Sequence, residues 1–256
     1  MRYVLLAFAL AGTAACSGGG GLTPPSSLNL VNTPVGAANF DVDYNSGLDI
    51  YTVEINGDTD FLPGDPALDL NTFDRASNPV TGTGLYVSTG NHSTVSLLQT
   101  EGATNLTAAQ YQRLTDGAVG QIESATYTGE YIGFLTNTVD DSLSFIADGN
   151  VELTIDLANV SVNGSISNRL LRDKDAIAPL LGPDLADIVL ETSTIDSDGQ
   201  FSGTATGGEL EGFMTDMGSY VGLIAGPNSD EAVGVVRVRH FGVATLQETG
   251  IIAVGH

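Results

Sequence analysis

Apolar and polar residues alternate without a break in two neighbouring stretches of this chain, residues 151–157 and 160–167. A period of two is typical of β-strands that have one buried face and one solvated face. The break between the stretches, at residues 158–159, is short enough for a hairpin turn. Together with the preceding stretch 127–135, these segments predict an antiparallel meander at the centre of the chain.

More short strands are predicted after the meander, at residues 187–195, 200–206, 209–214, 220–225 and 232–240, with a further segment at 250–254. The meander and the first five of these make eight strands, the natural number for a small closed barrel. Glycines inside several of them indicate sharp coiling or close backbone approach. A β-sandwich is the alternative, since it also uses many short strands.

The first half of the chain is less regular. Its predicted strands are residues 40–44, 50–55, 84–88 and 93–98. Residues 106–114 give the best local signal for a helix, with Thr107 as its N-cap and Gly117 as its stop. We therefore predict a β-rich subdomain over residues 40–122, packed against a barrel domain over residues 123–256.

The N-terminus predicts a secretory signal. Arg2 precedes an apolar run at residues 4–11, which is too short to span a bilayer, and small residues lead to Cys16, the only cysteine. This arrangement resembles the bacterial lipoprotein signal, which implies a signal peptide at 1–15, lipid attachment at Cys16 and a membrane anchor. Residues 16–39 are rich in Gly and Pro and predict a tether. Ser17 after the cysteine implies, by the sorting rule of such lipoproteins, the outer membrane. An ordinary signal peptide cut near Ala15 is the alternative.

Charge and motifs narrow the function. The chain has 31 acidic and 8 basic residues, a net charge of −23, which argues against nucleic acid as a partner. The spacing of acidic residues at 41–47 suggests a calcium loop, but the sixth and twelfth positions are Ser46 and Thr52 instead of Gly and Glu. We therefore expect a polar hairpin there, and a turn at residues 196–199.

No catalytic or metal site is predicted. A Gly-x-Ser-x-Gly elbow does not occur, and His92, His240 and His256 lack the spacing of zinc ligands. We expect no cofactor and no enzymatic activity.

Three of the few basic residues lie close together where the strand pattern breaks, at residues 169–187. They are Arg169, Arg172 and Lys174, and they are the only candidate binding residues that the sequence offers. The functional interpretation is a loop that contacts a partner. The structural interpretation is a crossover that caps the end of a sheet.

An ordered set of segments over residues 123–245 resembles the C-terminal β-barrel of the transferrin-binding protein B-like surface lipoproteins, a group that includes the factor H-binding protein type. The segments are Tyr-Thr-Gly-Glu-Tyr at 127–131, Leu-Thr-Ile-Asp at 153–156, Val-Asn-Gly-Ser-Ile at 162–166, Phe-Ser-Gly-Thr-Ala at 201–205 and the run around Gly-Pro at 225–235, with 241–244 similar to the closing strand. The resemblance implies a lipid anchor and a "handle" subdomain before the barrel. It carries no particular ligand with it.

The sequence thus predicts an all-β protein, with an eight-stranded antiparallel β-barrel preceded by a smaller β-rich, handle-like subdomain. We expect a lipid-anchored outer-membrane or cell-surface protein that binds a protein or a small solute without catalysis. Two alternatives stay open. One is a structural envelope lipoprotein without a specific ligand, and the other is a barrel whose interior holds a ligand.

Overall fold

The computed structural model describes residues 28–32, 40–70, 72–101, 105–114, 124–137, 139, 142–156, 158–174, 179–180, 185–209, 217–240 and 246–255. The predicted signal peptide with Cys16 lies outside these residues. So do His256, Gly117, residues 241–244 and most of the predicted strand 209–214.

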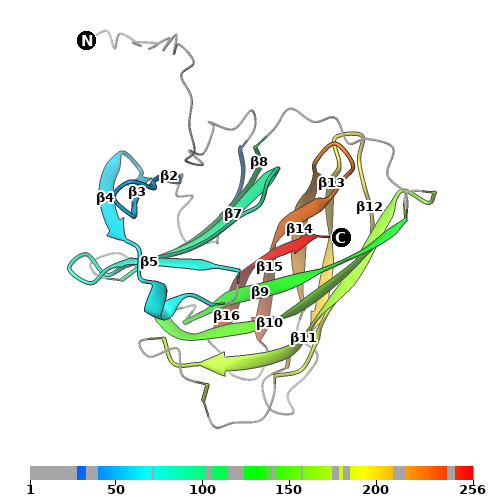
Figure 1. Cartoon of the computed structure of the whole chain (residues 1–256). Helices are drawn as coiled ribbons and strands as arrows, with labels where there is room; N and C mark the ends of the chain where they lie inside the picture. Colours follow the sequence, from blue (N-terminus) through cyan, green and yellow to red (C-terminus); the bar gives the residue numbers. More distant parts are fainter. Residues whose placement is uncertain are drawn as a thin grey trace, which may run out of the picture.

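The second half of the chain closes into an antiparallel barrel of eight strands, which confirms the predicted fold class and excludes a sandwich (Figure 1). Each strand pairs with the next one in the chain, and the last pairs with the first along its whole length. The strands are β9 (Ala125–Asn137), β10 (Leu143–Asp156), β11 (Ser161–Arg172), β12 (Ile188–Thr194), β13 (Gln200–Gly207), β14 (Met217–Ala225), β15 (Glu231–His240) and β16 (Leu246–Gly255).

The barrel has eight strands as predicted, but they are not the same eight segments. The closing strand is β16, which contains the segment 250–254 that the sequence left over as a ninth element. No described residue of the segment 209–214 belongs to a strand. β11 also runs further than expected and ends at Arg172, so Arg169 and Arg172 belong to a strand and not to a loop.

The first half of the chain forms two smaller sheets, as the predicted β-rich subdomain requires. A three-stranded sheet has the order β2-β3-β4, and a five-stranded sheet has the order β1-β8-β7-β6-β5. A single 3-10 turn, η1 (Pro66–Leu68), lies between β4 and β5. The strands are β1 (Leu28–Asn32), β2 (Phe40–Asn45), β3 (Ile50–Ile55), β4 (Asp58–Pro63), β5 (Asp74–Asn78), β6 (Thr83–Thr89), β7 (Ser93–Thr100) and β8 (Leu106–Arg113).

Two expectations for this half are wrong. Residues 106–114 do not form a helix, because they supply β8, which pairs with β7 on one side and β1 on the other. Every residue of β8 except Arg113 is buried, so packing on both faces overrides the local helix propensity. Residues 28–32, which belong to the expected tether 16–39, form β1 within the five-stranded sheet instead.

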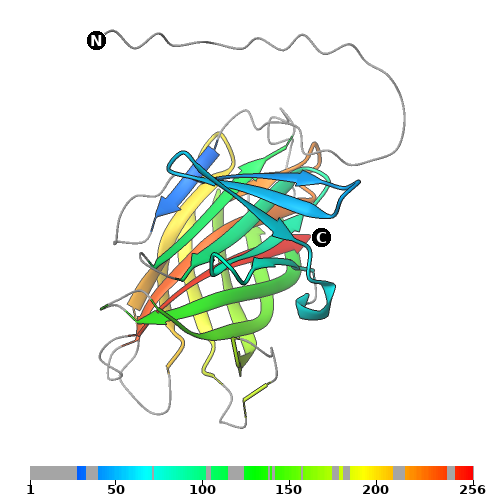
Figure 2. The same cartoon turned by 90° about the vertical axis from the view of Figure 1, so that its left-hand side faces the viewer.

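The molecule is layered, with the three-stranded sheet on the five-stranded sheet and the latter on the barrel (Figure 2). One cluster of apolar side chains fills the barrel interior. A second lies between the outer barrel wall and the five-stranded sheet, and joins Tyr86 and Leu97 to Phe134, Val235 and Ile251. A third lies between the two small sheets.

This layering explains the two kinds of strand pattern in the sequence. β15 is apolar almost continuously because Ala232 and Val236 point into the barrel, while Val233 and Val235 point to the covering sheet. In β10 the stretch from Val151 onward alternates buried and more exposed residues, because the wall there is covered on one face only.

Candidate functional site

The three basic residues singled out from the sequence do not gather on one exposed loop. Arg169 is fully buried at the end of the barrel interior. Arg172 makes a bidentate ion pair with Asp148, at 2.6 Å and 2.9 Å from the two carboxylate oxygens. Lys174 reaches out of the barrel to Glu101 of the subdomain, with Nζ 3.3 Å from Oε2.

Arg169 belongs to a buried polar network centred on Glu248 of β16. Its Nη2 lies 2.7 Å from Oε1 and 2.5 Å from Oε2 of Glu248. The Tyr131 hydroxyl donates to Oε1 at 2.7 Å, and His240 Nε2 lies 3.0 Å from Oε2. None of the four side chains is more than 3% exposed. The network therefore joins β9, β11, β15 and β16 inside the barrel.

The charges of this network are balanced. Burial by itself would raise the pKa of Glu248, but the Arg169 charge and the hydrogen bonds from His240 and Tyr131 outweigh it and lower that pKa to about 2. Burial tends to lower the pKa of Arg169, yet Glu248 raises it above the usual value. A buried pair in this state is a fixed structural element, because both partners stay charged across the physiological range.

Space for the network comes from two glycines. Gly133 of β9 and Gly250 of β16 lie opposite each other. A Cβ atom on either would lie within 2.5 Å of the Tyr131 hydroxyl oxygen. The tyrosine ring therefore packs over bare backbone, and its hydroxyl reaches Glu248 from there.

Polar contacts also fasten the subdomain to the barrel. Glu231, at the start of β15, accepts hydrogen bonds from the backbone N–H groups of Asn91 and His92 and from the Ser93 hydroxyl. Arg113, at the end of β8, donates to the carbonyl oxygens of Asp198 and Ile224 at 2.6 Å and 2.7 Å. These contacts, with the apolar cluster beneath them, fix one orientation of the two parts.

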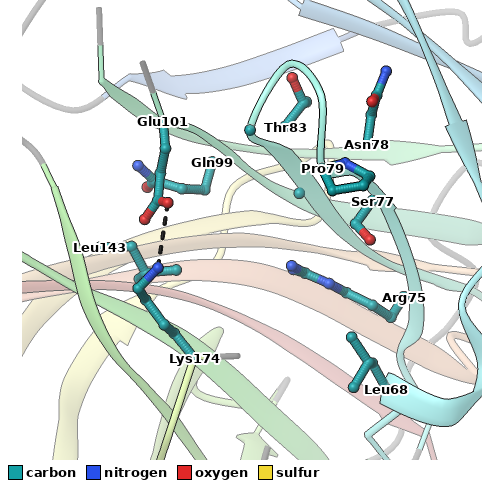
Figure 3. A pocket seen from close by; sticks show the side chains of 12 residues that line it. Leu68, Arg75, Ser77, Asn78, Pro79, Thr83, Gln99, Glu101, Leu143 and Lys174 are labelled. Carbon is teal, nitrogen blue, oxygen red and sulfur yellow. Dashed lines mark hydrogen bonds and ion pairs between the residues drawn. The ribbon is translucent and has the colours of Figure 1, made fainter. Parts of the chain in front are cut away.

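A cavity of about 360 Å³ lies at the other end of β6 and β7, where the edge of the five-stranded sheet meets the barrel (Figure 3). β5, β6 and β7, with the residues next to their ends, supply most of its wall, and the barrel contributes Leu143 and Lys174. Figure 3 shows Arg75 extending into this space, with the Lys174–Glu101 ion pair across from it. Its size falls in the range of small-molecule sites.

Arg75 is the unusual residue of the cavity. Its Nε and Nη1 are shielded from solvent and have no hydrogen-bond partner. The guanidinium lies 4.6 Å from the ring centroid of Tyr86, the residue opposite it on β6. Burial lowers the pKa of Arg75 and raises the pKa of Tyr86 to about 12. Arg75 thus keeps its charge in a place where water does not fully solvate it.

A second, smaller cavity of about 110 Å³ lies on the other side of β5, and its wall includes Asp49, Asp65, Asp69 and Asp74. The region expected to be a polar hairpin leads into it, and the structure confirms a hairpin between β2 and β3. The turn expected at 196–199 is also confirmed, because Asp196 accepts hydrogen bonds from the N–H groups of Asp198 and Gln200.

Within the described residues, no group of three His, Cys, Asp or Glu side chains comes together as metal ligands. The same part of the chain contains no helix long and apolar enough to cross a membrane.

Sequence reasoning did not find Arg75, Glu231 or Glu248. Arg75 stands in a polar segment, 74–78, that shows no strand alternation, and its neighbours in the cavity come from residues up to a hundred positions away. His240 was expected only to end a strand, which it does, but its partner Glu248 could not be paired with it from spacing alone.

Comparison with solved structures finds several structures of transferrin binding protein B. An isotype 1 transferrin binding protein B from Neisseria meningitidis serogroup B is 15% identical with a TM-score of 0.48, over 83% of this chain and 40% of that one. A variant of transferrin binding protein B from Haemophilus parasuis Hp5 is 9% identical with a TM-score of 0.49, over 84% of this chain and 44% of that one. The chain therefore spans about two fifths of the length of these proteins.

No protein-family model and no curated protein matches the chain. In structure, the chain is similar to the same proteins that its barrel segments resemble in sequence. At 9% to 15% identity and TM-scores below 0.5, this likeness assigns neither a ligand nor membership of the family to the chain.

Proposed function

We propose that this protein is a lipid-anchored, non-catalytic binding protein of the outer membrane. The observation that carries the proposal is Cys16, the only cysteine, which follows an apolar run with small residues and precedes a stretch rich in Gly and Pro. Acylation at this cysteine would hold the folded part near the membrane surface, and two or more acyl chains make such an anchor durable.

The form of the folded part supports a binding role outside the barrel. Tightly packed side chains, among them Tyr127, Tyr131, Phe201 and Tyr220, fill the barrel interior. The larger cavity lies between the barrel and the subdomain instead. A rigid barrel that carries a second layer offers a fixed surface and a fixed cavity for a ligand.

The anchor is tested by metabolic labelling of the full chain with a radioactive or clickable fatty acid in a Gram-negative host. We expect label on the native chain and none on Cys16→Ser. Ser17→Asp is the matched control: it keeps Cys16 and the label, and by the sorting rule it moves the protein to the inner membrane. Label that persists on Cys16→Ser would remove the anchor from the proposal.

Exposure at the cell surface is tested on the same cells with an external protease. We expect cleavage of the native chain in intact cells, because the tether would hold the folded part outside. Complete resistance in intact cells, with cleavage after lysis, would place the protein on the inner side of the membrane and would contradict a surface role.

A further inference from the structure

The guanidinium of Arg75 is the one charge in the larger cavity to which the structure gives no hydrogen-bonding partner among the described residues. Shielded N–H donors without acceptors cost free energy, because water no longer solvates them. Protein interiors rarely keep such groups, and each one calls for an explanation. The third nitrogen, Nη2, is not among the shielded atoms, and an anionic ligand in the cavity would give it an acceptor and compensate the charge of the guanidinium.

The guanidinium is held in place before any ligand arrives. Tyr86 lies against it at 4.6 Å, a cation–π distance. Gly84 lies two residues before Tyr86 on β6 and leaves room for the guanidinium. A Cβ atom at this position would lie 2.6 Å from Nη2 and 2.9 Å from Nη1 of Arg75. Any residue larger than glycine would therefore push the guanidinium out of its position. A guanidinium already fixed in position loses little conformational freedom when its accessible Nη2 binds an anion.

The rest of the wall sets the kind of anion. Lys174 and Glu101 face Arg75 as an ion pair, so the three charges leave one net positive charge in the cavity (Figure 3). Leu68, Leu143 and Pro79 add apolar surface beside it. A dianion such as phosphate would meet the Glu101 carboxylate and the field of a chain with net charge −23. A single negative charge on an apolar body matches both features.

We propose that this cavity is a binding site for a small organic monocarboxylate, whose carboxylate pairs with Arg75 and whose apolar part packs on Leu68 and Leu143. The inference rests on the proposed binding role and gives it a ligand class. The cavity volume of about 360 Å³ admits a molecule of this kind.

The test uses the full chain, purified in detergent, and calorimetric titration with benzoate, with benzamide as the uncharged probe of the same shape. We expect one benzoate per chain with a Kd of about 1 mM or tighter and no binding of benzamide. Arg75→Met should weaken benzoate binding by at least about 10-fold, because it removes the charge-assisted hydrogen bonds and keeps the side-chain volume. Its Tm should equal or exceed that of the native chain, since it removes two shielded N–H groups that have no acceptor.

Arg239→Met is the matched control, because it removes the same charge from an exposed position of β15 outside the cavity. It should leave the Kd for benzoate unchanged. Gly84→Ala should weaken binding while Arg75 itself is still present, since its Cβ atom displaces the guanidinium. Loss of binding in both cavity variants, but not in Arg239→Met, supports the site.

Three results would overturn the inference: no benzoate binding to the native chain, equal binding to Arg75→Met, or tighter binding of inorganic phosphate than of benzoate. None of these depends on Cys16, because the titration is done in detergent. If benzoate does not bind but the native chain carries the fatty-acid label, the cavity site is rejected and the anchor is kept. If benzoate binds but the label persists on Cys16→Ser, the anchor is rejected and the cavity site is kept.

Discussion

Replacing Arg169 with methionine would leave the Glu248 carboxylate buried inside the barrel without its charged partner. The two side chains are 0% and 1% exposed, and the guanidinium contacts both carboxylate oxygens. Removing one partner of a buried pair costs about 3–5 kcal/mol, because the other charge stays desolvated. We expect Arg169→Met to lose about that much free energy of unfolding at pH 7.

A double-variant cycle separates this cause from simple loss of packing. Arg169→Met combined with Glu248→Gln removes both charges; the amide oxygen can still accept from the Tyr131 hydroxyl, and the amide NH₂ can donate to Nε2 of a neutral His240. The double variant should recover at least about 2 kcal/mol relative to the sum of the single changes. Arg239→Met, at an exposed position, should change the free energy by no more than about 0.5 kcal/mol. Urea unfolding followed by circular dichroism measures the free energy of unfolding of the native chain, the two single variants, the double variant and Arg239→Met.

The pH dependence gives an independent check. The folded-state pKa of Glu248 is about 2, against 4.5 for the free side chain, so its ionised form stabilises the fold. A depression of this size corresponds to about 3 kcal/mol, present in full above the unfolded pKa and lost as the pH falls through the folded one. The difference in free energy of unfolding between the native chain and Arg169→Met should therefore be largest above about pH 5 and should become smaller towards pH 2. An additive cycle, or a gap of the same size at pH 3 and pH 7, would refute the reasoning.

Two further changes test the close strand contacts and the joint between the two parts. Gly218→Ala should destabilise the barrel by about 1–3 kcal/mol in urea unfolding, since its Cβ atom would lie 1.8 Å from the Arg237 carbonyl oxygen. Gly255→Ala is the control and should be near neutral, because the nearest atom to its Cβ would be 3.5 Å away. Equal effects of the two would contradict that close approach. Glu231→Ala should cost about 0.5–1.5 kcal/mol, because it removes the acceptor of the Asn91 and His92 N–H groups, which water can partly replace at these exposed and half-buried positions. Those amides should exchange hydrogen faster than in Glu152→Gln, an exposed control, and unchanged exchange would show that Glu231 does not hold this turn.

The fold was largely predictable because its strands carry clear patterns. The alternating stretch from Val151 fixed the meander, and the apolar run of β15 identified another strand even though both of its faces are buried. β8 was missed for a physical reason: Leu106 to Arg113 includes Ala, Gln and Leu, which favour a helix locally, and only burial between two layers makes them a strand. β5 was missed because an edge strand needs no apolar alternation.

The cavity was not predictable by the same means. Arg75, Gly84 and Lys174 meet only after β5 pairs with β6 and the five-stranded sheet docks on the barrel. The positions of these residues in the sequence do not indicate how the five-stranded sheet docks on the barrel. The cluster of Arg169, Arg172 and Lys174 drew attention because basic residues are rare here, yet their partners Glu248, Asp148 and Glu101 come from three distant strands or their ends.

The closure of the barrel by its first and last strands has a consequence for how the protein matures. β9 has an open edge until β16 arrives, and Arg169 has no counter-charge until Glu248 is in place. Synthesis from the N-terminus makes β16 after every other described strand. The incomplete barrel therefore exposes an unpaired strand edge, which is prone to aggregation, until β16 has been made. β16 thus completes the barrel by pairing with β9, and its Glu248 supplies the counter-charge of Arg169.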